Sequence, residues 1–165
     1  MPIQYKDGIV KEHISTRLYA GFFDVSHMGQ LFISGNKFSE DSLEKIIPLD
    51  FKEIKMNQSK YSFLINDEGG VIDDLIITRV EEGFNIILNA ACKDNDIKEI
   101  SKCLNSDSKY ELRKDLSLIA LQGPKSESIL ESIVNGVKQL KFMNGGYFDF
   151  EGNKIYITRS GYTGE

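Results

Sequence analysis

The clearest pattern of hydrophobic and polar positions lies in the middle of the chain. Two apolar runs with many β-branched side chains, at 60–66 and 71–80, flank the turn sequence Asp-Glu-Gly-Gly. Such runs around a glycine-rich turn predict an antiparallel hairpin. A third apolar run at 84–90 follows a second short turn, Glu-Glu-Gly. The pattern therefore predicts three consecutive antiparallel strands.

Three other segments carry apolar side chains at helical spacing. The predicted helices cover residues 36–47, residues 92–104 and a segment that Gly123-Pro124 opens. Pro48 is expected to end the first helix, and a proline suits the first turn of the third. The predicted buried stripes are Leu43, Ile46 and Ile47; Ile97, Ile100 and Leu104; and Ile129, Leu130, Ile133 and Val134.

Shorter apolar runs complete the pattern. They predict strands at 30–34, 109–113 and 117–122 and a hairpin over 147–160, whereas the first thirty residues are predicted to be loop-like. Antiparallel hairpins dominate this mixture of strands and helices. The expected fold class is therefore α+β, with mostly antiparallel sheets and flanking helices.

Two adjacent carboxylates interrupt the most apolar of the predicted strands. Side chains alternate faces along a strand, so Asp73 and Asp74 should point to opposite sides, and both sides are apolar. A carboxylate against apolar surface is costly unless it is paired, hydrogen-bonded or functional. One interpretation is a side chain that binds backbone N–H groups of the Gly-Gly turn. The other is a desolvated acid that accepts a proton from, or stabilises positive charge on, a substrate amine.

Composition narrows the possible functions. The chain has 165 residues, 41% of them hydrophobic, and a net charge of −5. Its lysines are scattered along the sequence, which argues against a nucleic-acid partner. No apolar run is long enough to cross a membrane, and the opening residues do not resemble a signal peptide. Two cysteines without a Cys-x-x-Cys motif and two isolated histidines favour a cytoplasmic protein with reduced thiols and no metal.

Other polar segments have a structural interpretation beside a functional one. The stretch at 22–30 places Asp24, Ser26, His27 and Gln30 close together. A catalytic triad is normally assembled from distant segments, so a structural loop with at most one substrate contact is favoured. The turn at 121–124 could offer free N–H groups to an anion, but it is better interpreted as a plain helix start.

Five ordered stretches are similar to one family over essentially the whole chain. They are AGFFDVSHMGQ, GGVIDDLI, NIILNAACKDND, LIALQGPKSESIL and TRSGYTGE. In order and spacing they resemble the aminomethyltransferases (T-proteins) of the glycine cleavage system. The resemblance implies that residues 31–113 form an inserted α+β domain, and that residues 1–30 and 114–165 are parts of a discontinuous first domain. It also implies a partial T-protein fold, because members of the family extend beyond both ends of this sequence.

The resemblance implies an activity with defined partners. Members transfer a methylene group from the aminomethyl-lipoyl arm of the H-protein to tetrahydrofolate and release ammonia. A partial chain would be inactive alone and prone to self-association through incomplete edges. The alternatives are a non-catalytic folate-binding module and a folate-dependent demethylase of the same superfamily.

Site residues follow from the motif positions. The second acid of the family's Asp-Asp pair is the catalytic carboxylate, which implies that role for Asp74. Asp73 would then be structural, and we expect it to pair with Arg79 on the same face of the strand.

Four further residues match positions that contact folate or line its cavity. Tyr61 would flank the pterin and Asn89 would bind its hydrogen-bonding edge. Tyr162 would line the cavity, and Glu165 is a further candidate ligand of the pterin.

Overall fold

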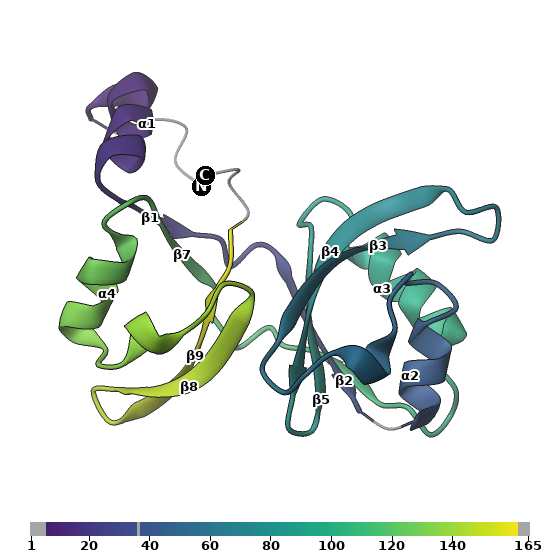
Figure 1. Cartoon of the computed structure of the whole chain (residues 1–165). Coiled ribbons are helices and arrows are strands. Elements are labelled where there is room, and N and C mark those ends of the chain that lie inside the picture. Colours follow the sequence, from purple (N-terminus) through teal and green to yellow (C-terminus); the bar gives the residue numbers. More distant parts are fainter. Residues whose placement is uncertain (1–5, 36, 162–165) are drawn as a thin grey trace.

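Three antiparallel sheets form the framework of the protein, which is described here from a computed structural model covering residues 6–35 and 37–161 (Figure 1). The largest sheet has the strand order β3-β4-β5-β2-β6. Its strands are β2 (Gly29–Ser34), β3 (Ser59–Ile65), β4 (Val71–Val80), β5 (Gly83–Leu88) and β6 (Tyr110–Leu112). Tight turns join β3 to β4 and β4 to β5, so the three apolar runs of the sequence form adjacent strands of the sheet.

The main hydrophobic core lies between this sheet and two helices. The helices are α2 (Lys37–Leu43) and α3 (Lys93–Cys103), and a short 3₁₀ helix, η1 (Phe51–Glu53), lies beside them. Figure 1 shows α2 and α3 together at one side of the sheet. Fully buried side chains come from both layers: Leu43 of α2 and Phe51 of η1 from the helical layer, and Ile77 and Ile86 from the sheet. Removal of this apolar surface from water is the principal force that holds the two layers together.

The remaining elements form a second group (Figure 1). They are α1 (Gly8–Leu18), β1 (Gly21–Asp24), β7 (Ile119–Gln122), α4 (Ser126–Ile133), the 3₁₀ helix η2 (Val137–Gln139), β8 (Asn144–Phe150) and β9 (Asn153–Arg159). Strand β1 pairs with β7, and β8 pairs with β9. The two groups touch where Gln58, just before β3, forms an isolated bridge with Asn144.

One glycine shows how closely the second group is packed. Gly123 has a φ of +116°, and a side chain there would come within 2.4 Å of the Thr16 carbonyl oxygen. Only glycine combines this backbone conformation with such a close approach. The end of α1 therefore lies against the turn that leads from β7 into α4.

The structure confirms the predicted α+β class with antiparallel sheets. The strands predicted at 60–66, 71–80 and 84–90 are present within two residues at each end, as is the helix predicted at 92–104. The large sheet takes its strands from residues 29–112, whereas β1 and β7 lie before and after that range. The division into an inserted domain (31–113) and a discontinuous one (1–30 and 114–165) stays a prediction.

Three local predictions were wrong. The first thirty residues contain α1 and β1 as well as loop, and α1 was missed because none of its side chains is buried, so it carries no apolar stripe. The helix predicted at 36–47 ends at Leu43, and the next residues form tight turns. Ile129 and Ile133 of α4, predicted to be buried, are exposed, whereas Val134 is buried as predicted.

Candidate functional site

The two acids of β4 follow a bulge, and they lie on opposite faces of the sheet because side chains alternate along a strand. Asp73 lies opposite the buried Leu64, and Asp74 lies opposite Phe63, but Val71 lies opposite Ile65, so that Ile72 is an extra residue in β4. A bulge of this kind bends the strand and re-aims its side chains. Asp73 shares its face with the core residues Leu75 and Ile77, so it faces the core covered by the helices, and Asp74 faces the opposite side of the sheet.

A single amide connects the two acids. Asn89 follows the last residue of β5, next to Asp74 across the strand pair. Its Nδ2 atom donates to Asp73 Oδ1 at 3.0 Å and to Asp74 Oδ1 at 2.8 Å, and the Asp74 carbonyl oxygen lies at 3.2 Å. An amide has two N–H groups, enough to hold one oxygen of each carboxylate. Asn89 thus fixes the orientation of Asp73 and Asp74 relative to each other.

Two aromatic side chains lie beside Asp74 on β3. Tyr61 and Phe63 form an edge-to-face pair with ring centroids 5.4 Å apart. Tyr61 is 51% exposed. A hydrogen bond from the Tyr61 hydroxyl to Asp74 raises the pKa of Tyr61, with burial and the charges of the two acids as lesser causes. This side of the sheet therefore presents accessible aromatic surface next to an oriented carboxylate.

A third acid faces the pair from the helical layer. Asp96, in the first turns of α3, is 1% exposed. Its two carboxyl oxygens and Asp73 Oδ2 are buried and receive no hydrogen bond from an N–H or O–H group of the described residues. Burial is the main cause that raises the pKa of Asp96 to about 7, and hydrogen bonding to Asp73 and the charge of Asp73 are the lesser causes. The charge of Asp73 is also the main reason why the pKa of Cys92, at the start of α3, is raised.

Sequence reasoning did not find Asp96. The predicted stripe of this helix was Ile97, Ile100 and Leu104, and all three pack in or against the core. Asp96 lies four residues before Ile100, and side chains at that spacing share a helix face. Asp96 could have been identified from the sequence as an acid on the same helix face as the apolar residues of this helix.

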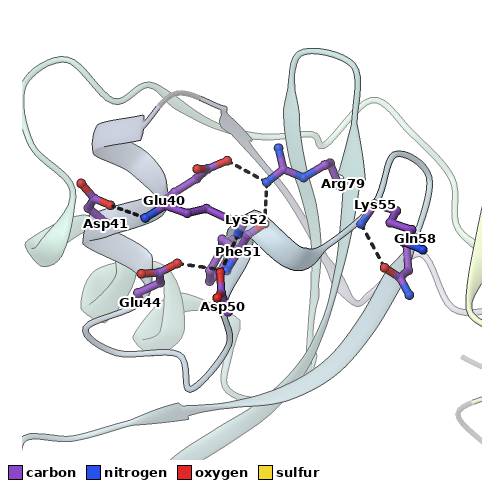
Figure 2. Close-up of polar contacts among 9 residues, drawn as sticks. All are labelled: Glu40, Asp41, Glu44, Asp50, Phe51, Lys52, Lys55, Gln58 and Arg79. Carbon is purple, nitrogen blue, oxygen red and sulfur yellow. Dashed lines mark hydrogen bonds and ion pairs between the residues drawn. The ribbon is translucent and has the colours of Figure 1, made fainter.

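The expected pairing of Asp73 with Arg79 is wrong. Arg79 lies six residues further along β4, and its Nη2 atom donates to Glu40 Oε1 at 2.7 Å and to the carbonyl oxygen of Phe51 (Figure 2). The nearest carboxylate within reach of the guanidinium therefore comes from α2 and not from its own strand. Asp73 instead receives a hydrogen bond from Asn89.

Tyr162 and Glu165 lie outside the described residues, so their predicted roles stay predictions. Of the polar residues at 22–30, Asp24 ends β1 and its Oδ1 atom accepts from the backbone N–H of Ser26 at 2.9 Å. Gln30 lies in β2, and its side chain donates to the Leu116 carbonyl oxygen at 2.8 Å. The first contact is local, whereas the second joins distant segments; the interpretation of this stretch as structural stays a prediction.

Thiols, metal-ligating groups, apolar helices and surface hollows are the other features that could indicate a function. Cys92 and Cys103 are free thiols. Within residues 6–35 and 37–161, no three metal-ligating side chains lie together. None of the described helices is both long and apolar enough for a membrane span. A hollow between α1 and β1, lined in part by Thr16 and Phe22, contains none of the predicted site residues.

Comparison with known proteins gives consistent matches. A family model described as the GCVT N-terminal domain matches residues 1–165. The chain is 39% identical to a mitochondrial aminomethyltransferase of Dictyostelium discoideum and 40% identical to a probable mitochondrial aminomethyltransferase of Schizosaccharomyces pombe. All of the chain aligns in both cases, with 43% and 44% of the relatives' lengths. It therefore spans less than half the length of these curated relatives.

A solved structure agrees with the sequence matches. The crystal structure of the glycine cleavage system aminomethyltransferase T from Bartonella henselae is 37% identical and superposes with a TM-score of 0.83. The match covers 99% of this chain and 45% of that one. The resemblance drawn from the sequence motifs is thereby confirmed: the chain belongs to the GCVT N-terminal domain family of glycine cleavage aminomethyltransferases.

Proposed function

We propose that this chain provides the catalytic carboxylate of a tetrahydrofolate-dependent aminomethyltransferase. The reaction transfers a methylene group from the aminomethyl-lipoyl arm of the H-protein to tetrahydrofolate and releases ammonia. Tetrahydrofolate supplies the amine nitrogens that receive the one-carbon unit. The proposal extends to this chain what its relatives' names state and what the motif positions imply.

The arrangement around Asp74 supports the proposal. A reduced pterin is a flat ring with several N–H groups, so it suits an aromatic surface next to hydrogen-bond acceptors. The accessible face of Tyr61 is such a surface, and the Asp74 carboxylate beside it is the acceptor. A fixed carboxylate there stabilises the positive charge that develops on the transferred group and holds a proton that the amine gives up.

The single observation that carries the proposal is the double hydrogen bond of Asn89. Its amide holds Asp74 Oδ1 at 2.8 Å while it also holds Asp73. A group that is already oriented needs no reorganisation when charge develops, and this is what makes electrostatic stabilisation effective. A carboxylate with a purely turn-forming role has no need of a second side chain to orient it.

Replacement of Asp74 by asparagine tests the role of its charge. The asparagine oxygen can still accept from Asn89, so the fold should be kept. We expect Asp74→Asn, in the protein that carries this chain, to lower the rate of methylene transfer from lipoylated H-protein by about 10²–10⁴-fold. The matched control is Asp67→Asn in the exposed turn of the same hairpin. Ammonia release and formation of methylenetetrahydrofolate are measured together.

The same assay separates the proposal from its alternatives. Wild-type protein that binds tetrahydrofolate but releases no ammonia with lipoylated H-protein would be a folate-binding module. Formation of methylenetetrahydrofolate from methylated amines, and not from H-protein, would identify a demethylase. Equal transfer rates in wild-type protein and the Asp74→Asn variant would remove Asp74 from the catalytic role.

A further inference from the structure

Asp96 is a buried acid without a conventional partner. It lies in the first turns of α3, and its backbone N–H is already used in the helix, where it donates to the Cys92 carbonyl oxygen at 3.0 Å. Its side chain is 1% exposed. No lysine or arginine of the described residues forms an ion pair with it, and its own oxygens receive no N–H or O–H. An ionised carboxylate in such a place is strongly disfavoured.

The group that Asp96 faces is a second acceptor. The Asp73 carboxyl group raises the pKa of Asp96 through hydrogen bonding and through its charge, and Asp73 Oδ2 is likewise buried and without a donor. Two carboxylates cannot hydrogen-bond unless one of them carries a proton. A single proton on one Asp96 oxygen removes one negative charge and provides the donor that Asp73 Oδ2 lacks, as occurs when two carboxyl groups share one site.

The described titratable groups that interact with the pair favour this proton. From β4 come Asp73 and Asp74, and from the start of α3 comes the thiol of Cys92, whose pKa is itself raised by Asp73. On β3, the hydroxyl of Tyr61 responds to both acids of β4. All these groups are neutral or negative, so none compensates a second charge on the pair.

The protonated pair acts on the rest of the site through Asn89. The remaining negative charge of the pair lies on Asp73, whose Oδ1 accepts from Asn89 Nδ2 at 3.0 Å. The same nitrogen donates to Asp74 Oδ1 at 2.8 Å. If Asp96 were ionised, repulsion between the two carboxylates would push Asp73 away and break its hydrogen bond with the Asn89 amide. The orientation of Asp74 would then no longer be fixed.

We propose that Asp96 is a positioning residue: its protonated carboxyl group donates a hydrogen bond to Asp73, and the chain of contacts from Asp96 through Asp73 and Asn89 orients the carboxylate of Asp74. This inference rests on the proposed function only where it takes Asp74 to be the catalytic carboxylate. The shared proton itself does not depend on any activity.

The proton is tested directly by carboxyl ¹³C NMR on protein with ¹³C-labelled aspartate. We expect one aspartate signal that titrates near neutral pH in the wild-type protein and is absent from Asp96→Asn. Asp94→Asn, at an exposed position in the same helical turn, is the matched control and should keep the signal. If every aspartate in the wild-type protein titrates below pH 5, the shared proton does not exist and the inference is wrong.

The positioning role is tested by two variants of different hydrogen-bonding capacity. Asparagine can donate an N–H to Asp73 without carrying a charge, whereas leucine cannot donate. We expect Asp96→Asn to keep kcat for methylene transfer within a few-fold and Asp96→Leu to lower it by about 10²-fold, because small misplacements of a catalytic group have effects of that size. The alkaline fall in kcat caused by ionisation of the pair should be present in wild-type protein and absent from Asp96→Asn.

The outcomes keep the two proposals apart. A wild-type protein without transferase activity would overturn the proposed function, and the NMR titration would still decide whether the proton is shared. Wild-type kcat in a folded Asp96→Leu variant would overturn the positioning role. If Asp96→Leu does not fold, the pH dependence of kcat in Asp96→Asn is the test. An alkaline fall in kcat that is the same in Asp96→Asn as in the wild-type protein would contradict the inference.

Discussion

Replacement of Arg79 by methionine should lower the free energy of unfolding by about 2–3 kcal/mol. The Arg79 guanidinium donates to Glu40 Oε1 at 2.7 Å and to the Phe51 carbonyl oxygen (Figure 2). Its central carbon lies 4.8 Å from the centroid of the Phe84 ring. It therefore joins α2 and η1 to β4. Methionine keeps much of the apolar stem and removes the charge and both hydrogen bonds.

The magnitude follows from the burial of the pair. Hydrogen bonds to charged groups contribute about 1.5–3 kcal/mol, and loss of one partner of a fully buried ion pair costs about 3–5 kcal/mol. The side chains of Arg79 and Glu40 are 22% and 14% exposed, so water reaches the carboxylate that is left behind and the lower part of that range applies. A cation over the Phe84 ring adds a smaller contribution.

Figure 2 also shows the matched control. Lys52 Nζ lies 3.9 Å from Asp41 Oδ1, and these side chains are 59% and 47% exposed. Exposed pairs of this kind contribute little, so Lys52→Met should change the free energy of unfolding by less than about 0.5 kcal/mol. The chain has no tryptophan, so unfolding in urea is followed by circular dichroism. Equal losses in Arg79→Met and Lys52→Met would refute the argument.

Three further predictions concern the site and the surface. The pKa of Asp96 rises from 3.8 to about 7 on folding, so the folded protein holds the proton more tightly and loses stability as the pH rises. Between pH 4 and pH 8 the free energy of unfolding of the wild-type protein should fall by about 4 kcal/mol relative to that of Asp96→Asn, measured by urea unfolding at each pH. Asn89→Ala should weaken tetrahydrofolate binding by at least about 0.5–1.5 kcal/mol in calorimetry, and unchanged affinity would exclude Asn89 from the site. The 165-residue chain should self-associate through exposed apolar side chains such as Phe22, which is 72% exposed, and Phe22→Lys should reduce this association in sedimentation experiments.

The sequence was sufficient for those elements in which local pattern and tertiary packing agree. The hairpin of β3 and β4 combines alternating apolar residues with a Gly-Gly turn, and its strands lie at the predicted positions. Helix α3 has a stripe that is buried against the sheet. In both cases the buried face is visible as a period in the sequence.

The elements that were missed have no such agreement. Helix α1 has no buried side chain, so its apolar residues follow no stripe. In α4, Ile129 and Ile133 have the spacing of a buried face but are exposed, because the described residues place nothing over them. A period in the sequence shows that a face can be buried, whereas the partner that buries it comes from elsewhere in the fold.

The candidate site divides in the same way. Asp74, Tyr61 and Asn89 could be named because motif positions pointed to them, and the structure brings them together at one end of β4. The partner of Arg79 could not be named from the sequence, because the strand pattern does not show which carboxylate lies next to the guanidinium. That carboxylate is Glu40, and its position depends on where α2 packs.

The surroundings of Asp73 and Asp74 explain why two adjacent acids are tolerated in an apolar strand. Asp74 lies outside the core because side chains alternate along the strand and the register places Asp74 opposite Phe63, on the aromatic side of the sheet. Asp73 faces the core, where its charge is tolerable only with donors: one comes from Asn89, and the other requires the proton of Asp96. Neither turn-binding nor direct catalysis describes Asp73. A buried acid can therefore serve a site without touching a substrate, provided that a second acid, distant in sequence, stays neutral beside it.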